Sequence, residues 1–268
     1  NRAYEPLLFD VDTVPFPVNG GEQATFDALE AACKAGAAAF IVEPLVLGAG
    51  GMLVYSPAVL AEMRRICAAH EVLFIADEVM TGWGRTGTLL ACEQAGVTPD
   101  LLCLSKGLTG GAIPLAVTMA SEAIWDAHFS ADRGQMFFHS SSYTANPIAC
   151  AAANANLAIW REEPVGARIA LLAERQAAGL ARLSSHPRIA NPRQLGTIIA
   201  MEVETADEGY LSDLGPRLKA AFSRRDVLLR PLGNTIYVMP PYCIESSDLT
   251  RIHDTILDAV DSVVAGRE

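Results

Sequence analysis

Two short apolar segments of this chain end in residues that can carry chemistry. Residues 72–76 read Val-Leu-Phe-Ile-Ala and lead directly into Asp77. Residues 101–104 read Leu-Leu-Cys-Leu and lead through Ser105 to Lys106, which opens a glycine-rich turn. Apolar runs of this length, bounded by turn residues, predict buried strands. Because open α/β sheets bind ligands at the carboxyl ends of their strands, an acid and an amine are expected at one rim.

Each of these residues also has an ordinary structural interpretation. An aspartate at the end of a strand can cap the following helix or turn, and a lysine can be a solvated surface residue. The strand over 101–104 aims Lys106 at the same rim as Asp77, however, and its turn is too small and too rich in glycine for core packing. This shared position favours a reactive site.

The first part of the chain alternates between helical and strand patterns. Because strands that alternate with helices favour a mostly parallel sheet, we expect an α/β fold. Helices are expected at 22–34, from Pro57, near 89–94 and from Ser121, with further strands at 38–43, expected to be buried, and at 115–120.

The second part begins with a long alanine-rich helix that starts at Asn146-Pro147 and runs to about Trp160. Such helices commonly link domains, so we expect a large domain over residues 1–161 and a small α+β domain over 162–268. Within the small domain we expect helices at 165–183, 210–224 and 247–264, and strands at 197–203, 227–230 and 235–238.

Composition narrows the class of protein. With 51% hydrophobic residues the chain can bury a large core, and its net charge of −11 argues against nucleic acid or an anionic membrane as partner. No apolar run is long enough to span a membrane without a charge or a glycine or proline break, and no secretory leader opens the sequence. The six cysteines lack close pairing, which indicates free thiols in a reducing cytoplasmic compartment. No metal site is expected.

Three motifs together carry a resemblance to a known family. The strand that ends in Asp-Glu-Val, the Gly-Trp-Gly-Arg-Thr-Gly turn at 82–87 and Ser-Lys-Gly-Leu-Thr-Gly-Gly at 105–111 resemble the class III aminotransferases of fold type I. The resemblance implies pyridoxal 5'-phosphate (PLP) as cofactor. Lys106 would then form an imine with it and move a proton as general base and acid, Asp77 would contact the pyridinium nitrogen, and Val79 would pack beneath the ring.

Two further segments extend the resemblance. The Glu-Pro turn that starts at Glu43 matches a family turn whose glycines let backbone approach the cofactor, although Leu47 stands where the family often has glutamine. Residues 139–147 resemble a segment whose threonine binds the cofactor phosphate of the neighbouring subunit, and Ser142 falls on that position. Each segment has a structural alternative. The Glu-Pro turn can be an ordinary loop before a helix. Residues 139–147 can be a capping cluster for the helix after Asn146, and for Ser140, Ser141 and Thr144 this interpretation is nearly as good.

Residues 229–242 point to the substrate. Arg230 falls where the family grips a substrate carboxylate, and Tyr237 falls in the substrate pocket. The pattern Arg-Pro-x-Gly-x-x-x-Tyr-x-Met-Pro-Pro-Tyr is similar to the branch that transfers the amino group of S-adenosylmethionine to 8-amino-7-oxononanoate in biotin biosynthesis. A hairpin with its turn at Gly233-Asn234 is the structural alternative, and it explains neither the arginine nor Pro-Pro-Tyr.

The resemblance also implies a homodimer with active sites at the interface. Compared with the family, a front portion with its phosphate-binding Gly-Ser turn and ring-covering aromatic is expected to be missing, and Trp83 replaces the usual phenylalanine. Two alternatives stay open. One is an ω-amino acid or diamine transaminase of the same class, and the other is an inactive remnant that serves as a binding partner.

Overall fold

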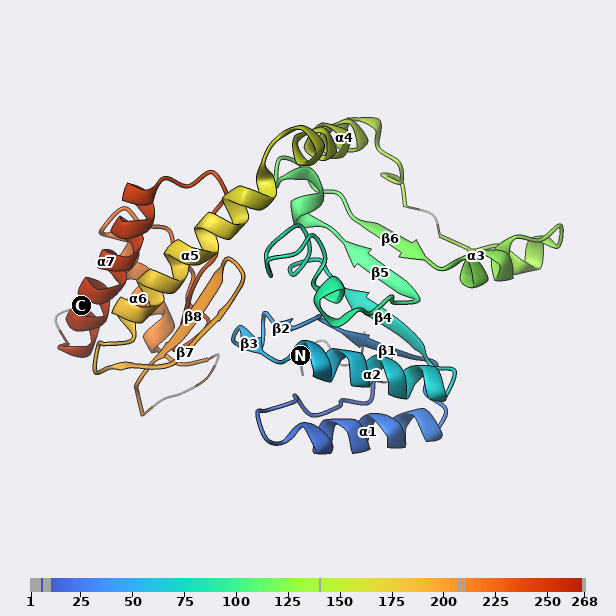
Figure 1. The fold of residues 1–268 in the computed structure, drawn as a ribbon, viewed down its shortest axis with the longest axis horizontal. Coiled ribbons are helices and arrows are strands. Elements are labelled where there is room, and N and C mark those ends of the chain that lie inside the picture. Colours follow the sequence, from blue (N-terminus) through green and yellow to red (C-terminus); the bar gives the residue numbers. More distant parts are fainter. Residues whose placement is uncertain (1–5, 7–10, 140, 207–208, 210, 267–268) are drawn as a thin grey trace.

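The computed structural model describes residue 6 and residues 11–139, 141–206, 209 and 211–266. Figure 1 shows two lobes, each built around its own sheet and linked by two long helices, α4 (Pro147–Glu162) and α5 (Val165–Leu183). No helix in the described part of the chain is both long and apolar enough to cross a bilayer. All six cysteines are free, as expected.

The first lobe contains a four-stranded sheet in the order β1-β4-β5-β6. Strands β1 (Ala39–Val42), β4 (Leu73–Asp77) and β5 (Leu101–Leu104) run parallel, and β6 (Val117–Ala120) is antiparallel to β5. The prediction of a mostly parallel α/β sheet is confirmed. Its register sets Asp77 opposite Cys103, so the ends of β4 and β5 reach the same edge.

Helices α1 (Glu22–Lys34) and α2 (Pro57–Ala69) pack together beside this sheet (Figure 1). The predicted start of α2 is confirmed, because the Ser56 side chain accepts a hydrogen bond from the Val59 N–H and Pro57 occupies the first helical position. Their buried faces join β4 and β5 in one core, with Leu60, Met63 and Phe74 at its centre. A short hairpin, β2 (Val46–Leu47) and β3 (Leu53–Val54), projects towards the second lobe.

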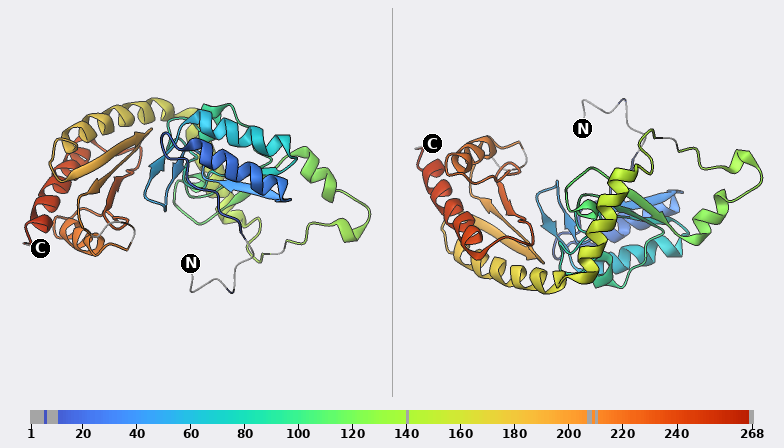
Figure 2. Two further views of the ribbon diagram at one scale, coloured as in Figure 1. Left: turned by 90° about the horizontal axis from the view of Figure 1, so that it is seen from below. Right: turned by 90° about the horizontal axis from the view of Figure 1, so that it is seen from above.

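Two predictions for the first lobe were wrong in detail. The strand expected to be buried at 38–43 lies at an edge of the described sheet, and the Ile41 side chain is 59% exposed. The helix expected near 89–94 is a short 3₁₀ helix, η2 (Ala91–Ala95). Two more short helices, α3 (Glu122–His128) and η4 (Arg133–Gln135), lie in a segment that extends away from the sheet, on the side opposite the second lobe (Figures 1 and 2).

The second lobe contains an antiparallel sheet in the order β7-β8-β9, with bounds Ile189–Leu195, Ile198–Val203 and Thr235–Val238. Helices α5, α6 (Leu214–Ser223) and α7 (Ser246–Val264) supply the remaining side chains of its core, which is separate from that of the first lobe. The α+β character of this part agrees with the expectation. The proposed boundary at residues 161 and 162 stays a prediction.

The strand predicted at 227–230 is wrong, because these residues lie in a loop. Pro231 follows them and has no N–H to donate to a ladder, and only one bridge, between Leu232 and Thr235, precedes β9. The helix expected at 210–224 begins at Leu214, and Tyr210 lies outside the described residues. Strand β7 was not predicted. It contains Pro192, within a register irregularity between Ala190 and Arg193.

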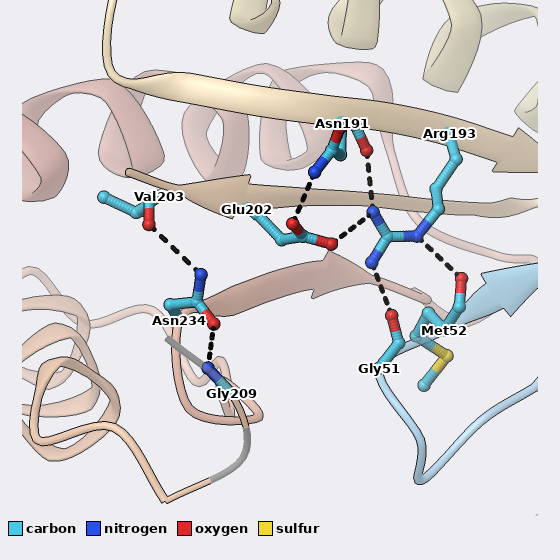
Figure 3. A network of polar contacts seen from close by, with 8 residues as sticks. All are labelled: Gly51, Met52, Asn191, Arg193, Glu202, Val203, Gly209 and Asn234. Atoms are coloured by element: carbon cyan, nitrogen blue, oxygen red, sulfur yellow. Dashed lines mark hydrogen bonds and ion pairs between the residues drawn. The ribbon is translucent and has the colours of Figure 1, made fainter. Parts of the chain in front are cut away.

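Hydrogen bonds join the lobes at several places in the described part of the chain. Arg193 of β7 donates to the carbonyls of Gly51 (2.5 Å) and Met52 (2.9 Å) in the β2–β3 turn, and it also pairs with Glu202 at 2.9 Å (Figure 3). Elsewhere, Arg85 donates to the Pro240 carbonyl at 2.6 Å. These contacts fix the second lobe against the loops that follow β1 and β4.

Candidate active site

Asp77 is the last residue of β4 and lies half-buried at the carboxyl edge of the sheet. Its Oδ1 accepts a hydrogen bond from the Val79 N–H at 3.1 Å. The hydrogen bonds found within the described residues do not use Oδ2. One carboxylate oxygen therefore holds the following turn, and the other is available to a donor from outside the chain.

The neighbouring acid, Glu78, has a different environment. It is fully buried, and its carboxylate accepts hydrogen bonds from the Thr81 hydroxyl (2.8 Å) and from the backbone N–H groups of Ala91 (2.9 Å) and Cys92 (2.8 Å). These donors belong to the start of η2 and to the turn after β4. Glu78 thus connects the turn after β4 to the start of η2. Its carboxylate is occupied by these hydrogen bonds and is not free to bind a ligand or transfer a proton.

Lys106 begins the 3₁₀ helix η3 (Lys106–Thr109), two residues after β5 ends. Its backbone lies in the left-handed region with φ 45°, which is costly for a residue with a side chain and is typical of functional turns. The lysine is exposed, and no ion pair within the described residues engages its amine. Because β4 and β5 are adjacent and parallel, Lys106 and Asp77 lie at the same rim, as predicted.

Glu43 follows β1 at this rim. Its Oε2 accepts a hydrogen bond from the Gly48 N–H at 3.2 Å. A Cβ on Gly48 would lie 2.5 Å from the Met80 sulfur, so a larger residue there would displace the end of the Met80 side chain. Burial raises the pKa of the Glu43 carboxyl; Gly48 and the Lys106 amine oppose this rise, and the charge of Asp77 adds to it. The Glu43, Asp77 and Lys106 charges are therefore close enough to influence one another.

The two residues predicted to bind substrate lie in the second lobe. Tyr237 is on β9 opposite Ala200, and it packs against a small apolar cluster that includes Val46 and Met52 of the first lobe. The cluster brings β9 beside the hairpin that follows Glu43. Arg230 is exposed in the loop before the bridge at Leu232, and no hydrogen bond or ion pair within the described residues engages its guanidinium.

Ser142 is not brought to this rim by contacts within the chain. It is exposed in a turn between η4 and α4, and its hydroxyl has no protein partner in the described part of the chain. Asn146 caps α4, because its Oδ1 accepts hydrogen bonds from the N–H groups of Ile148 and Ala149. The capping alternative is not seen for Ser141 or Thr144, because their side chains make no hydrogen bond to α4 within the described residues. Ser140 lies outside the described residues.

Two residues near Lys106 were missed by the sequence reasoning. Trp83 packs directly against Gly107, and Asn156 of α4 bonds to the carbonyls of Gly107 and Leu108. The only sequence signal for Asn156 is a polar residue in an alanine-rich helix. Asn154 carries the same signal and is exposed, so sequence alone could not distinguish them.

A lysine and an acid at the carboxyl edge of an open α/β sheet, beside a second lobe, define the class of PLP-dependent transferases of this fold. Residues 7–260 match the family model of the class-III aminotransferases, and the chain belongs to that family. The adenosylmethionine-8-amino-7-oxononanoate aminotransferase of Synechococcus elongatus is 43% identical over 98% of this chain and 64% of its own length. The chain therefore spans slightly less than two thirds of this relative.

Solved structures agree with this assignment. The adenosylmethionine-8-amino-7-oxononanoate aminotransferase of Methanocaldococcus jannaschii superposes with a TM-score of 0.90 at 27% identity, covering 97% of this chain and 62% of the other. An (S)-enantioselective omega-transaminase from Thermomicrobium roseum superposes with a TM-score of 0.83 at 32% identity, covering 91% and 56%. The fold is thus shared by more than one kind of transaminase.

PLP is the cofactor of class III aminotransferases. The residues at the rim fit this group chemically. Among the described residues, Lys106 offers an amine outside any ion pair, and Asp77 offers an unused carboxylate oxygen that can accept a hydrogen bond from a pyridinium nitrogen. The turn after Lys106 continues through Gly110 and Gly111, where a ligand could approach the backbone closely.

Proposed function

We propose that this chain carries part of a transaminase that converts 8-amino-7-oxononanoate to 7,8-diaminononanoate with S-adenosylmethionine as amino donor. The observation that carries the proposal is the convergence of Asp77 and Lys106 at the ends of adjacent parallel strands, with Glu43 within electrostatic reach. The names of the Synechococcus and Methanocaldococcus relatives support the substrate pair.

In this proposal, five residues hold or act on the cofactor. PLP, when bound, supplies an electron sink for a negative charge on the substrate carbon. Lys106 attaches to the cofactor through its amine and, once released, carries a proton to and from the substrate carbon. Asp77 keeps the pyridine nitrogen protonated, and Val79 packs beneath the ring. Glu43 flanks the rim, and the Ser142 hydroxyl donates to a phosphate oxygen.

Arg230 and Tyr237 are proposed to contact the substrate from the second lobe. An exposed guanidinium that no other described residue engages can pair with a carboxylate through two parallel hydrogen bonds. The apolar cluster around Tyr237 places its β9 strand beside the hairpin after Glu43, which supports a pocket wall at this position. The carboxylate of 8-amino-7-oxononanoate is the group that Arg230 would bind.

A single-turnover experiment tests the donor. Conversion of bound PLP to pyridoxamine phosphate is followed after S-adenosylmethionine, lysine, alanine or a diamine is added to protein extended to the length of its relatives. Fast conversion with S-adenosylmethionine alone is expected. Fast conversion with a diamine and none with S-adenosylmethionine would assign the chain to an ω-amino acid or diamine transaminase, an alternative that the Thermomicrobium structure supports.

We also propose that two copies of the chain associate as a homodimer. The segment between β6 and α4 exposes several large apolar side chains, namely Trp125, Phe129, Phe137, Phe138 and Tyr143, each at least 64% exposed. It also carries Ser142, whose proposed partner is a cofactor in the other subunit. Apolar patches of this kind typically mark interfaces.

Sedimentation velocity of the double variant Phe137→Ser and Phe138→Ser tests the dimer. The variant is expected to sediment as a monomer while the parent chain dimerises. Leu228→Ser is the matched control, because Leu228 is 88% exposed but lies in the second lobe. A dimer that persists in the double variant, or a monomeric parent, would contradict the proposed interface.

A further inference from the structure

The turn that carries Lys106 has an unusual backbone. Lys106 itself has φ 45°, and Gly110 and Gly111 follow with φ 62° and 83°. Internal hydrogen bonds close the turn, from the Gly110 N–H to the Gly107 carbonyl (3.1 Å) and from the Gly111 N–H to the Lys106 carbonyl (3.2 Å). A left-handed residue with a side chain is disfavoured by about 1–2 kcal/mol, so the surroundings must hold this conformation.

Helix α4 supplies one side of that support. The Asn156 amide Nδ2 lies 2.9 Å from the Gly107 carbonyl and 3.1 Å from the Leu108 carbonyl, and its two hydrogens can serve both acceptors. These carbonyls directly follow Lys106 in the chain. The Asn156 oxygen also lies near Gly110, where a Cβ would be 3.5 Å away.

Trp83 supplies a second contact. A Cβ on Gly107 would lie 2.6–2.8 Å from the Cβ, Cγ and Cδ1 atoms of Trp83, so the Trp83 side chain leaves no room for a side chain at position 107. Trp83 in turn stands edge-on to Trp160, with ring centroids 5.9 Å apart. Because Trp160 follows Asn156 by four positions, α4 presents both on one face. The turn therefore contacts both Asn156 on this face of α4 and the Trp83 side chain, which itself packs against the same face.

We propose that Asn156 is a positioning residue, which fixes the Lys106 turn so that the lysine amine is presented to the cofactor. This inference rests on the proposed role of Lys106. Helix α4 connects directly to α5 and so to the lobe that carries Arg230. In this proposal α4 therefore both links the lobes and positions the Lys106 turn.

The chain offers a matched control for this proposal. Asn154 lies in the same helix two positions away and is exposed, and it makes no side-chain hydrogen bond within the described residues. Asn154→Ala and Asn156→Ala therefore change the helix propensity in the same way, but only the second removes the contacts with the turn. Asn156→Asp is the second test variant, because it keeps the size and replaces the amide donor with an acceptor that faces two carbonyls.

Two measurements on the folded chain test the proposal. Hydrogen exchange followed by mass spectrometry reports the backbone N–H groups of Gly110 and Gly111 without cofactor. Addition of excess PLP and trapping with cyanoborohydride reports the rate at which Lys106 is labelled. For both Asn156 variants we expect exchange about tenfold faster in this turn and labelling about threefold to tenfold slower, as for loss of a typical hydrogen bond. Asn154→Ala should match the parent.

The outcomes separate this inference from the proposed function. If exchange in the turn and labelling of Lys106 are the same in the Asn156 and Asn154 variants, Asn156 does not position the turn, although Lys106 can still be the attachment site. If PLP labels Lys34 or Lys219 in the parent chain and leaves Lys106 unmodified, the proposed function itself fails. Thermal melting of each variant identifies any general loss of folding, which would raise exchange in all segments rather than in this turn alone.

Discussion

The positions of Lys106 and Asp77 follow from two adjacent parallel strands, β5 and β4. The chain contains only three lysines, Lys34, Lys106 and Lys219, which makes the attachment site easy to test. Lys34 pairs with Glu30 at 2.7 Å, whereas Lys106 has no such partner within the described residues. An amine outside an ion pair is available to form an imine with an aldehyde cofactor.

Replacement of Lys106 by alanine should abolish the borohydride-reducible PLP adduct, whereas Lys34→Ala should leave it intact. Mass spectrometry of the reduced protein locates the adduct. Asp77→Asn keeps an acceptor for the Val79 N–H but removes the negative charge, so the cofactor should still bind in part while proton removal from the substrate slows far more. An adduct that moves to another lysine in Lys106→Ala would contradict the assignment.

Arg230→Ala should reduce kcat/KM for 8-amino-7-oxononanoate. The expected loss of transition-state stabilisation is about 1.5–3 kcal/mol, the typical contribution of a hydrogen bond to a charged group. Arg230→Lys keeps the charge but loses the planar fork, so its effect should be intermediate. Steady-state kinetics with a ketone that lacks the carboxylate provides the control. An equal loss with both ketones would mean that Arg230 does not bind this group.

At the scale of the element, buried polar side chains connect helices, strands and turns in both lobes. Glu78 joins the turn after β4 to the start of η2, and Gln176 of α5 joins β8 and β9 through hydrogen bonds to the carbonyls of Thr197 (3.0 Å) and Val238 (3.1 Å). His253 of α7 bonds to the Gln176 oxygen at 3.1 Å, so its Nε2 carries the hydrogen. Each group is costly to leave unpaired.

Glu78→Ala should destabilise the protein by about 2–4 kcal/mol, because it leaves the N–H groups of Ala91 and Cys92 buried without partners. Glu93→Ala is the matched control in the same element, since the exposed Glu93 side chain contacts only the Leu90 N–H, at 3.3 Å. Denaturant unfolding measures both variants. Equal and small losses would show that Glu78 does not hold η2.

His253 predicts a dependence of stability on pH. Burial lowers its pKa below the usual 6.5, the positive charge of Arg182 adds to this, and Asp254 opposes it. The unfolded chain therefore takes up the proton more readily. The contribution of the neutral His253 ring to the free energy of unfolding is fully present above pH 6.5. It is lost as the pH falls from there towards the pKa of His253 in the folded protein.

Unfolding free energies of the parent and His253→Gln, measured between pH 5 and 8, test this expectation. The parent should lose stability relative to the variant as pH falls below about 6.5, the ordinary histidine value. His128→Gln is the control, because His128 is exposed. A difference between parent and His253→Gln that stays constant with pH would contradict the prediction.

At the scale of the whole molecule, the two lobes meet around the rim, while much of the first lobe stays open. All four residues of β6 are exposed, and so are the apolar side chains of the segment that follows it. Arg193 and Arg85 hold the second lobe to the loops after β1 and β4. In the described chain, hydrogen bonds therefore connect the two lobes, and a large apolar surface is exposed on β6 and on the segment that follows it.

Residues 1–268 alone are expected to lack transaminase turnover, because the chain spans only 64% of the Synechococcus relative. A version extended to the relative's length should turn over. Both are compared under the same conditions with saturating PLP. Equal turnover would refute the expectation, whereas an extended chain without any adduct would favour the inactive binding partner.

The sequence by itself predicted the features that depend on neighbouring residues. The helix start at Ser56, the end of β4 at Asp77 and the turn at Lys106 after β5 follow from local caps, apolar runs and glycine turns. The same reasoning failed at 227–230, where Pro231 prevents a ladder, and it placed 38–43 in the interior although β1 lies at an edge of the described sheet.

The tertiary structure decided which polar residues serve the rim. Glu78 is bound by N–H groups 13 and 14 positions away, and Asn156 reaches carbonyls 48 and 49 positions away. No local pattern separates Asp77 from Glu78 as the open acid, or Asn156 from Asn154 as the residue at the Lys106 turn. These choices depend on which face of each element packs inward, and only the folded chain fixes that.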